Sequence, residues 1–153
     1  MIIDEATLRT IIEDACGDGS APLATDLGGE WVIDLTSDRL VPLVTALLEA
    51  GAVHHLTAIT GLDAGAELEV LYHFWSAQGL TLRVRCPRRG GELPSLVPIL
   101  PAADWYEREV CDLLGVCFAG HPDLRRLVLP DDWDAPPPLL AEDRREDQPE
   151  EGA

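Results

Sequence analysis

The pattern of hydrophobic and polar positions along the first hundred residues predicts a series of short helices and strands. Apolar residues spaced three or four apart predict a helix over residues 4–15 and a second helix that contains Leu43 and Leu47 and ends at Gly51. Pro42 would then lie in the opening turn of this second helix. Between the two helices, the alternating sequence EWVIDLT predicts a first strand.

Three further segments predict strands of one sheet. Residues 53–60 are rich in β-branched side chains, residues 68–75 alternate, and residues 80–86 alternate between apolar side chains and Thr or Arg. Gln78-Gly79 is a typical tight turn, so we expect the last two strands to form an antiparallel hairpin. This order of elements predicts an α+β fold: a single domain with a mostly antiparallel sheet, helices packed on one face and an extended C-terminal tail.

The regular pattern breaks after these strands. The sequence PRRGG at residues 87–91 ends the sheet, residues 95–100 predict a short helix, and Pro101 stops that helix. The chain then reaches residues 104–133, which hold most of its candidate chemistry.

A charged helix is predicted at residues 105–114. Asp104 and Glu107 have the spacing of a reciprocal capping box, in which Asp104 accepts a hydrogen bond from the backbone N–H of Glu107, and Gly115 is the expected left-handed residue at the other end. Helical periodicity predicts a core-facing arc of Tyr106, Val110, Leu113 and Leu114, opposite a polar arc of Trp105, Arg108, Glu109 and Asp112.

A rigid turn follows this helix. Gly120 permits a sharp bend and Pro122 disfavours helical backbone before it, so His121 is presented from a loop and not from a helix. Arg125 and Arg126 follow, and because the chain has no lysine, its basic contacts are made mainly by directional guanidinium groups. We interpret these residues as a salt-bridged clamp that orients the turn or docks a partner.

A divalent-metal or acid–base site is the weaker alternative. Carboxylates and imidazole suit several metal ions, and the donors would be Glu107, Glu109, Asp112 and His121. The arginines of the same segment place competing positive charge there. Helical spacing also puts Glu107 on a different arc from the other two carboxylates.

Composition narrows the function classes. The 153 residues are 46% hydrophobic, and 11 basic against 28 acidic residues give a net charge of −17, which argues against nucleic acid or anionic lipid as a partner. No apolar run approaches the roughly 20 residues that span a bilayer, and no basic-then-apolar signal pattern opens the chain. We therefore expect the protein to stay in the compartment where it is made and to reach a membrane only through partners.

The cysteines and glycines supply no cofactor motif. Cys16, Cys86, Cys111 and Cys117 contain no C-x-x-C pair, which disfavours a zinc or iron–sulfur site and favours free, buried thiols. The sequence also has no Walker loop, G-x-G-x-x-G or G-x-S-x-G motif. We interpret the chain as an interaction subunit and not as a free enzyme.

The C-terminal segment differs in composition from the rest. Residues 131–153 contain nine acids and two arginines, and PPP occurs at residues 136–138. Such a segment has too few apolar side chains to form a core. We predict a domain over residues 1–133 and an acidic, Pro-rich tail, extended or disordered, over residues 134–153.

From residue 107 onward the chain reads EREVCDLLGVCFAGHPDLRRL. This run resembles the signature of the 30 kDa-subunit family of respiratory complex I, which related membrane-bound hydrogenases share. The predicted family motif and partner interface consists of Glu107, Arg108, Glu109, Asp112, Gly115, Phe118, Gly120, His121, Pro122, Leu124, Arg125 and Arg126. Family members typically continue with a basic tail, whereas this chain continues with the acidic one.

The resemblance implies a non-catalytic structural subunit in the peripheral arm of a proton-translocating NADH-quinone oxidoreductase. It implies that the chain packs against a hydrogenase-like large subunit near the quinone site, with iron–sulfur subunits as further partners and the membrane arm contacted indirectly. This chain would hold no cofactor or metal, whereas the partners would hold iron–sulfur clusters and quinone, with flavin or a NiFe centre. The implied location is peripheral, on the cytoplasmic side of the cell inner membrane. The alternative is the equivalent subunit of an energy-converting NiFe hydrogenase.

Overall fold

The computed structural model describes residues 4–17, 23–25, 29–75 and 79–140 of the chain. The helices are α1 (Glu5–Cys16), α2 (Ser37–Glu49), the 3-10 helix η2 (Pro101–Ala103) and α3 (Asp104–Leu114). The strands are β1 (Leu23–Thr25), β2 (Trp31–Leu35), β3 (His55–Asp63), β4 (Glu67–Trp75), β5 (Gly79–Pro87), β6 (Glu92–Pro94) and β7 (Cys117–Ala119). None of the helices in the described ranges is long and apolar enough to cross a lipid bilayer.

Five strands form the main sheet in the order β1-β2-β5-β4-β3, and β6 pairs with β7 in a small parallel sheet. β3, β4 and β5 are antiparallel neighbours, whereas β2 and β5 run parallel because α2 carries the chain across one face before the antiparallel strands return it to β2. The predicted α+β class and antiparallel hairpin are confirmed. Gln78 of the predicted tight turn lies outside the described residues.

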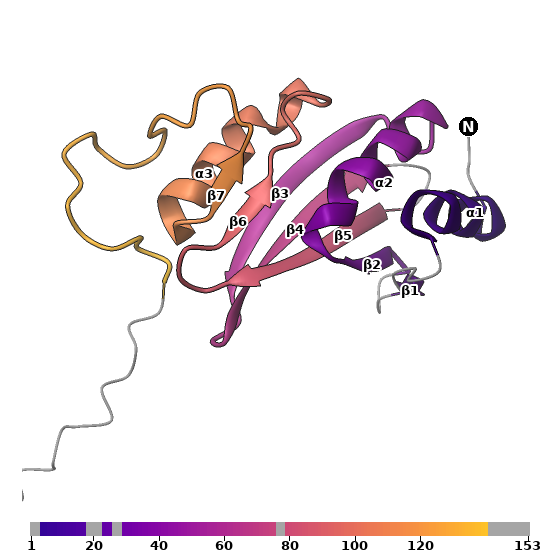
Figure 1. The fold of residues 1–153 in the computed structure, drawn as a ribbon, viewed down its shortest axis with the longest axis horizontal. Coiled ribbons are helices and arrows are strands. Elements are labelled where there is room, and N and C mark those ends of the chain that lie inside the picture. The colour runs from indigo at the N-terminus through magenta and orange to yellow at the C-terminus, as the bar shows by residue number, and fades with distance from the viewer. Residues whose placement is uncertain (1–3, 18–22, 26–28, 76–78, 141–153) are drawn as a thin grey trace, which may run out of the picture.

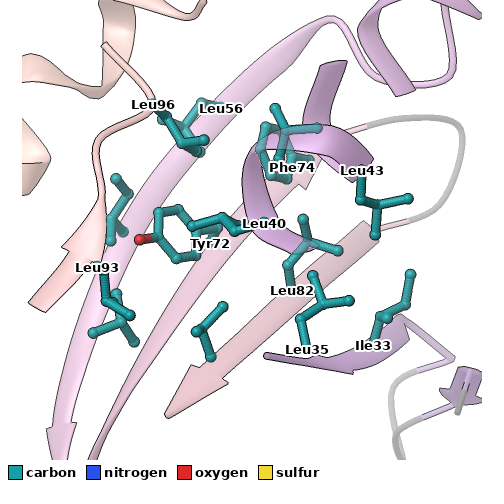
Figure 2. Close-up of a cluster of buried hydrophobic side chains, with 14 of the residues drawn as sticks. Ile33, Leu35, Leu40, Leu43, Leu56, Tyr72, Phe74, Leu82, Leu93 and Leu96 are labelled. Atoms are coloured by element: carbon teal, nitrogen blue, oxygen red, sulfur yellow. The ribbon is translucent and has the colours of Figure 1, made fainter. Parts of the chain in front are cut away.

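The core fills the space between the sheet and α2 (Figures 1 and 2). Alternate strand residues such as Ile33, Tyr72 and Leu82 have no exposed surface, and Leu40 and Leu43 of α2 are equally buried above them. Burying one such aliphatic side chain contributes roughly 1.5–3 kcal/mol. The contact between α2 and the sheet therefore fixes the frame on which the later segments are placed.

Polar side chains on the other face of the sheet pair across the strands. Arg83 Nη2 donates to Asp34 Oδ2 over 2.8 Å, and Arg85 Nε donates to Glu69 Oε1 over the same distance. These pairs join β2, β5 and β4. The alternation of the sequence thus separates a buried apolar face from a face of matched charges.

The prediction that Pro42 lies in the opening turn of α2 is wrong. The helix begins at Ser37, so Pro42 lies inside it. The proline is exposed, and its ring removes only the backbone hydrogen bond to the carbonyl of Asp38. The strongly apolar face of α2 compensates for that loss.

The predicted helix at residues 95–100 is also wrong. This segment forms turns between β6 and η2. Ser95 and Leu96 both donate hydrogen bonds to the side chain of Glu107, and the N–H groups of Ile99 and Leu100 return to the carbonyl of Leu96, which closes a single turn and not a helix. A side chain eleven or twelve residues away thus decides the local conformation.

All four cysteines are free, as predicted. Cys16 and Cys86 are buried and Cys111 is partly buried, but Cys117 is exposed. The expectation of burial is wrong for Cys117 because side chains alternate in β7, and the neighbouring Phe118 takes the inward position.

α3 packs closely against β3 at Gly61. A side chain at this glycine would collide with Leu114 and come within 3.3 Å of the Val110 side chain. Leu114 and Val110 are both buried, so neither side chain can move aside easily. The close approach of helix and strand therefore depends on the absence of a side chain at this position.

We predict that Gly61→Val destabilises the chain by roughly 1–3 kcal/mol, the usual cost of overfilling a packed core. Ala58→Val is the matched control, because Ala58 lies on the same strand but pairs with His73, on the face away from the core. Denaturant unfolding of the two variants tests this. Equal midpoints would show that α3 does not pack on Gly61.

Candidate functional site

The start of α3 differs from the predicted capping box. Asp104 is the first helical residue and makes no capping bond, because η2 precedes it and the backbone N–H of Asp104 donates to the carbonyl of Pro101. Glu107 reaches away from the helix end. The prediction of a D-x-x-E box is therefore wrong, whereas Gly115 ends the helix in the predicted left-handed conformation and donates to the carbonyl of Cys111.

The Glu107 carboxylate lies in the interior and holds the turn after β6. Its side chain has 0% exposure, Ser95 Oγ donates to Oε2 over 2.6 Å, and the Leu96 N–H donates to Oε1 over 2.7 Å. Burial raises the pKa of Glu107, and the bonds from Ser95 and Leu96 oppose that rise only in part. This acid therefore ties α3 to the turn after β6 at the cost of desolvation.

His121 lies on a turn outside the helix, as predicted, but its ring points inward. The side chain has 0% exposure, and the N–H of Asp123 donates to Nδ1 over 3.0 Å. Because Nδ1 accepts, the neutral ring carries its proton on Nε2. Nε2 lies 3.4 Å from the Asp104 carbonyl and 4.0 Å from Glu107 Oε2. His121 thus joins the turn to the first turn of α3.

Asp112 organises the loop that follows the turn. Its Oδ2 accepts hydrogen bonds from three consecutive backbone N–H groups, those of Leu127 and Val128 over 2.8 Å and of Leu129 over 3.1 Å. Desolvation opposes ionisation, but these bonds together with Arg126 outweigh it and hold the pKa of Asp112 below its ordinary value. One charged oxygen thus replaces the regular backbone pairing that this loop lacks.

Two arginines fasten the same loop by binding carbonyl groups. Arg108 donates from Nε to the carbonyl of Arg125 over 2.9 Å and from Nη2 to the carbonyl of Arg126 over 3.1 Å. Arg126 donates in turn to the carbonyls of Pro130 and Trp133, over 3.2 and 2.9 Å. The predicted clamp is present within the chain, but its main acceptors are backbone carbonyls and not carboxylates.

The predicted polar arc of α3 is therefore not a uniformly solvated face. Asp112 has only 9% exposure and the Arg108 side chain 12%, because residues 124–133 return over this side of the helix. Trp105 and Glu109 are exposed, as the arc predicts. Helical periodicity predicts only the direction in which each side chain points. It contains no information about a distant segment, here residues 124–133, that covers part of a polar face.

The predicted motif residues divide by exposure. Glu107, Asp112 and Phe118 are buried, and Arg108, His121 and Leu124 are partly buried. Glu109, Gly115, Gly120, Pro122, Arg125 and Arg126 are exposed. That these positions contact a partner stays a prediction. In the described part of the chain, no three His, Cys, Asp or Glu side chains gather as metal ligands.

Large apolar side chains beside the motif are exposed although the motif does not include them: Trp105 (68%), Leu127, Val128 and Leu139. The position of Trp105 on the polar arc is a sequence signal that could have identified it. Nothing in the sequence pattern marks Val128 or Leu139, because their exposure depends on the path of an irregular loop. Together these side chains leave apolar surface exposed beside α3.

Part of the predicted tail lies against α3. The N–H of Leu139 donates to the carbonyl of Leu113 over 2.9 Å, Leu140 packs partly buried against the core, and the ring of Pro137 lies beside Gly115. The boundary predicted after residue 133 stays a prediction, since residues 141–153 lie outside the described ranges. The described contacts extend the ordered path of the chain to residue 140.

The model of the family described as the respiratory-chain NADH dehydrogenase, 30 Kd subunit, matches residues 33–148. A protein of Moorella thermoacetica that is named as a subunit of NADH-quinone oxidoreductase is 39% identical over 102 residues, which are 63% of this chain and 69% of that protein. A protein of the same name in a Nocardioides species is 32% identical over 127 residues, 77% of this chain and 51% of that one. The chain thus spans about two thirds of one relative and half of the other.

Two solved structures are similar. A trypsin-resistant fragment of Nqo5 shares 28% identity at a TM-score of 0.61, with 76% of this chain and 98% of the fragment covered. A chain from the membrane-bound sulfane sulfur reductase, an archaeal respiratory membrane complex, shares 24% identity at a TM-score of 0.71, with 84% and 77% covered. Because the sulfane sulfur reductase chain is only 24% identical, its similarity shows a shared fold and nothing more.

We predict that Asp112→Asn lowers the free energy of unfolding at neutral pH by roughly 1.5–3 kcal/mol, the range for hydrogen bonds to a charged group. Because the pKa of Asp112 is lowered, its contribution is fully present above the ordinary aspartate value of 3.8 and is lost as pH falls through the lower value of the folded chain. Unfolding curves at several pH values test this. A deficit that did not shrink in acid would contradict the role of the charge, and Asp131→Asn is the exposed control.

We predict that Arg126→Ala lowers the melting midpoint of the isolated chain by roughly 2–4 °C, the shift that about 1 kcal/mol produces at this size. Arg9→Ala is the control, because Arg9 forms only an exposed i,i+4 pair with Glu5. Arg88 is unsuitable as a control, since it donates to Asp63 within a largely buried pair. An unchanged midpoint for Arg126→Ala would show that its carbonyl contacts do not hold the loop.

Proposed function

The chain belongs to the family of the 30 Kd subunit of the respiratory-chain NADH dehydrogenase, and we propose that it is a non-catalytic structural subunit in the peripheral arm of a proton-translocating NADH-quinone oxidoreductase. The match over residues 33–148 carries this proposal, because it spans α2, β3, β4, β5, α3 and the loop after α3. Relatives of 39% and 32% identity are named as subunits of that oxidoreductase.

The bonding of the motif supports a structural role. Glu107 and Asp112 accept hydrogen bonds from backbone N–H groups of their own chain, and Arg108 donates to its carbonyls. Charged groups that are hydrogen-bonded to the backbone of their own chain fix the shape of a surface. They have little freedom to exchange protons with a substrate. The motif would therefore shape a docking surface and not an active site.

The exposed apolar side chains beside α3 support a protein partner. Aromatic and aliphatic side chains at the centre of an interface supply most of its binding energy. Trp105 on α3 is 68% exposed, and Val128, which lies within the arginine-held loop, is 51% exposed. We propose that this side of α3 packs against the hydrogenase-like large subunit of the complex, near its quinone site, and that iron–sulfur subunits are further partners.

The cofactors are proposed to lie in those partners. Iron–sulfur clusters, flavin and quinone would supply the redox chemistry, and this chain would hold the partners in place. The four cysteines here are free and lie on α1, β5, α3 and β7. We propose a peripheral position on the cytoplasmic side of the cell inner membrane, reached through the partner subunits.

The equivalent subunit of an energy-converting NiFe hydrogenase is the second candidate. The sulfane sulfur reductase chain is similar in fold alone, whereas the relatives with higher identity are named for NADH-quinone oxidoreductase. We therefore place the dehydrogenase first. The two candidates differ in the chains that accompany the subunit: flavin- and NADH-binding subunits indicate the first, and a large subunit with four metal-binding cysteines indicates the second.

We predict that the tagged full-length chain, purified from solubilised membranes of its host, brings down the large subunit and flavin-containing partners. Trp105→Ala should reduce recovery of the large subunit several-fold, because it removes an apolar anchor, without lowering the melting midpoint of the isolated chain. Trp75→Ala is the matched control: Trp75 is 61% exposed but follows the buried Phe74 and so points to the other face of the sheet.

Mass spectrometry of the recovered chains provides the measurement. Equal recovery with both tryptophan variants would place the contact away from α3. Redox activity of the purified chain without any partner would contradict the structural role altogether.

A further inference from the structure

β3 forms one edge of the main sheet. The residues of β3 whose backbone groups bond to β4 can be told from those whose backbone groups point outward. At the end of the hairpin the N–H of Ala64 donates to the carbonyl of Glu67 over 3.0 Å, so these two residues form a hydrogen-bonded pair. In an antiparallel ladder such pairs recur at every second residue. The register then makes hydrogen-bonded pairs of Leu62 with Glu69, of Thr60 with Leu71 and of Ala58 with His73.

The residues between these pairs point their backbone groups away from the sheet. They are Ile59 and Gly61, whose N–H and C=O groups face the free edge of β3. No described residue donates to or accepts from them. The edge is closed only at its start, where the hydroxyl of Tyr106 donates to the carbonyl of Thr57 over 3.0 Å.

A groove of about 270 Å³ runs along this edge. Four consecutive residues of β3, Ala58–Gly61, line it. Side chains of a strand alternate between two faces, so consecutive residues can line one groove only where it follows the backbone edge. The opposite wall is α3, with Glu109, Val110 and Leu113, and Leu139 lies at the border.

α3 covers this edge in part, so that Ile59 is only 4% exposed, but the strand itself lacks the usual protection. Natural edge strands are blunted by lysine, proline, bulges or a covering segment. In β3 the sequence HLTAITGLD has no lysine or proline, and its register shift lies at Leu56/Ala58, before the open stretch. Unpaired backbone groups beside an apolar groove are the features by which a sheet edge accepts an added strand.

We propose that a partner subunit adds a short extended segment to β3 between Ala58 and Leu62, places an apolar side chain in the groove and sets an arginine or lysine beside Glu109. This proposal rests on the subunit function proposed above and specifies one mode of docking. The apolar side chain is required by the walls of Val110 and Leu113. The cation is required because Glu109 is exposed and has no ion-pair partner among the described residues.

Two other occupants fit less well. Residues 141–153 of this chain have the sequence AEDRREDQPEEGA, in which alanine is the only aliphatic side chain, so they offer little to an apolar groove. A second copy paired through β3 would bring two Glu109 side chains together in molecules of net charge −17. A cationic extended segment of a different subunit satisfies the backbone, the groove and the charge together.

Hydrogen exchange at single-residue resolution tests the proposal, measured on the full chain alone and in the purified complex. In the isolated chain the amides of Ile59 and Gly61 should exchange rapidly, and in the complex they should slow by about tenfold or more. The amides of Ala58 and Thr60 bond to β4 and should be slow in both states, which makes them internal controls.

Three results overturn the proposal. Rapid exchange of Ile59 and Gly61 in the complex would mean that no strand is added. Protection in the isolated chain that grows with concentration would identify a second copy, and protection at every concentration would identify a segment of the chain itself. If large-subunit recovery persists without protection, the edge proposal fails and the subunit function stands; if no partner is recovered, both fail.

A charge variant provides a second measurement. Glu109→Lys should lower recovery of the partner about tenfold at low salt, since a charge at the rim of an interface acts mainly through electrostatic attraction. Glu49→Lys makes the same charge change at the exposed end of α2 and should leave recovery unchanged. Equal losses with the two variants would mean that net charge alone acts, and this result would overturn the assignment of Glu109.

Discussion

The structure after residue 91 depends on two carboxylates that α3 directs into different parts of its own chain. Asp112 accepts three consecutive backbone N–H groups of the loop after the Gly-His-Pro turn, and Glu107 accepts from Ser95 and Leu96 on the turn after β6. Neither segment has extensive regular backbone pairing. Each is held because an acid on the helix supplies acceptors that a sheet or helix would otherwise supply.

The pKa values of the two acids are shifted in opposite directions. Three hydrogen bonds and Arg126 lower the pKa of Asp112 despite desolvation, whereas desolvation raises the pKa of Glu107 despite its two bonds. The contribution of Asp112 is therefore lost as pH falls, and that of Glu107 is present below its ordinary pKa and lost as pH rises through the raised value.

The sequence predicts those parts of the fold in which neighbours along the chain decide the outcome. Alternation in β4 and β5 predicts the hairpin, and Gly115 predicts the end of α3. The capping box fails because D-x-x-E spacing cannot reveal that Glu107 has a partner eleven residues earlier. The polar arc is only partly right for a similar reason: a loop that periodicity cannot detect covers Asp112. β1, β6 and β7 have three residues each, too few to show any period.

The charged motif that marks the family in the sequence is bonded mostly inside the chain, so the docking surface proposed above draws largely on other groups. The structure offers apolar side chains such as Trp105 and the unpaired backbone of β3 at Ile59 and Gly61. A backbone edge presents the same donors and acceptors whatever side chains it carries. Such an edge leaves no motif in the sequence, and it is recognised only from the strand order and the phase of one hairpin hydrogen bond.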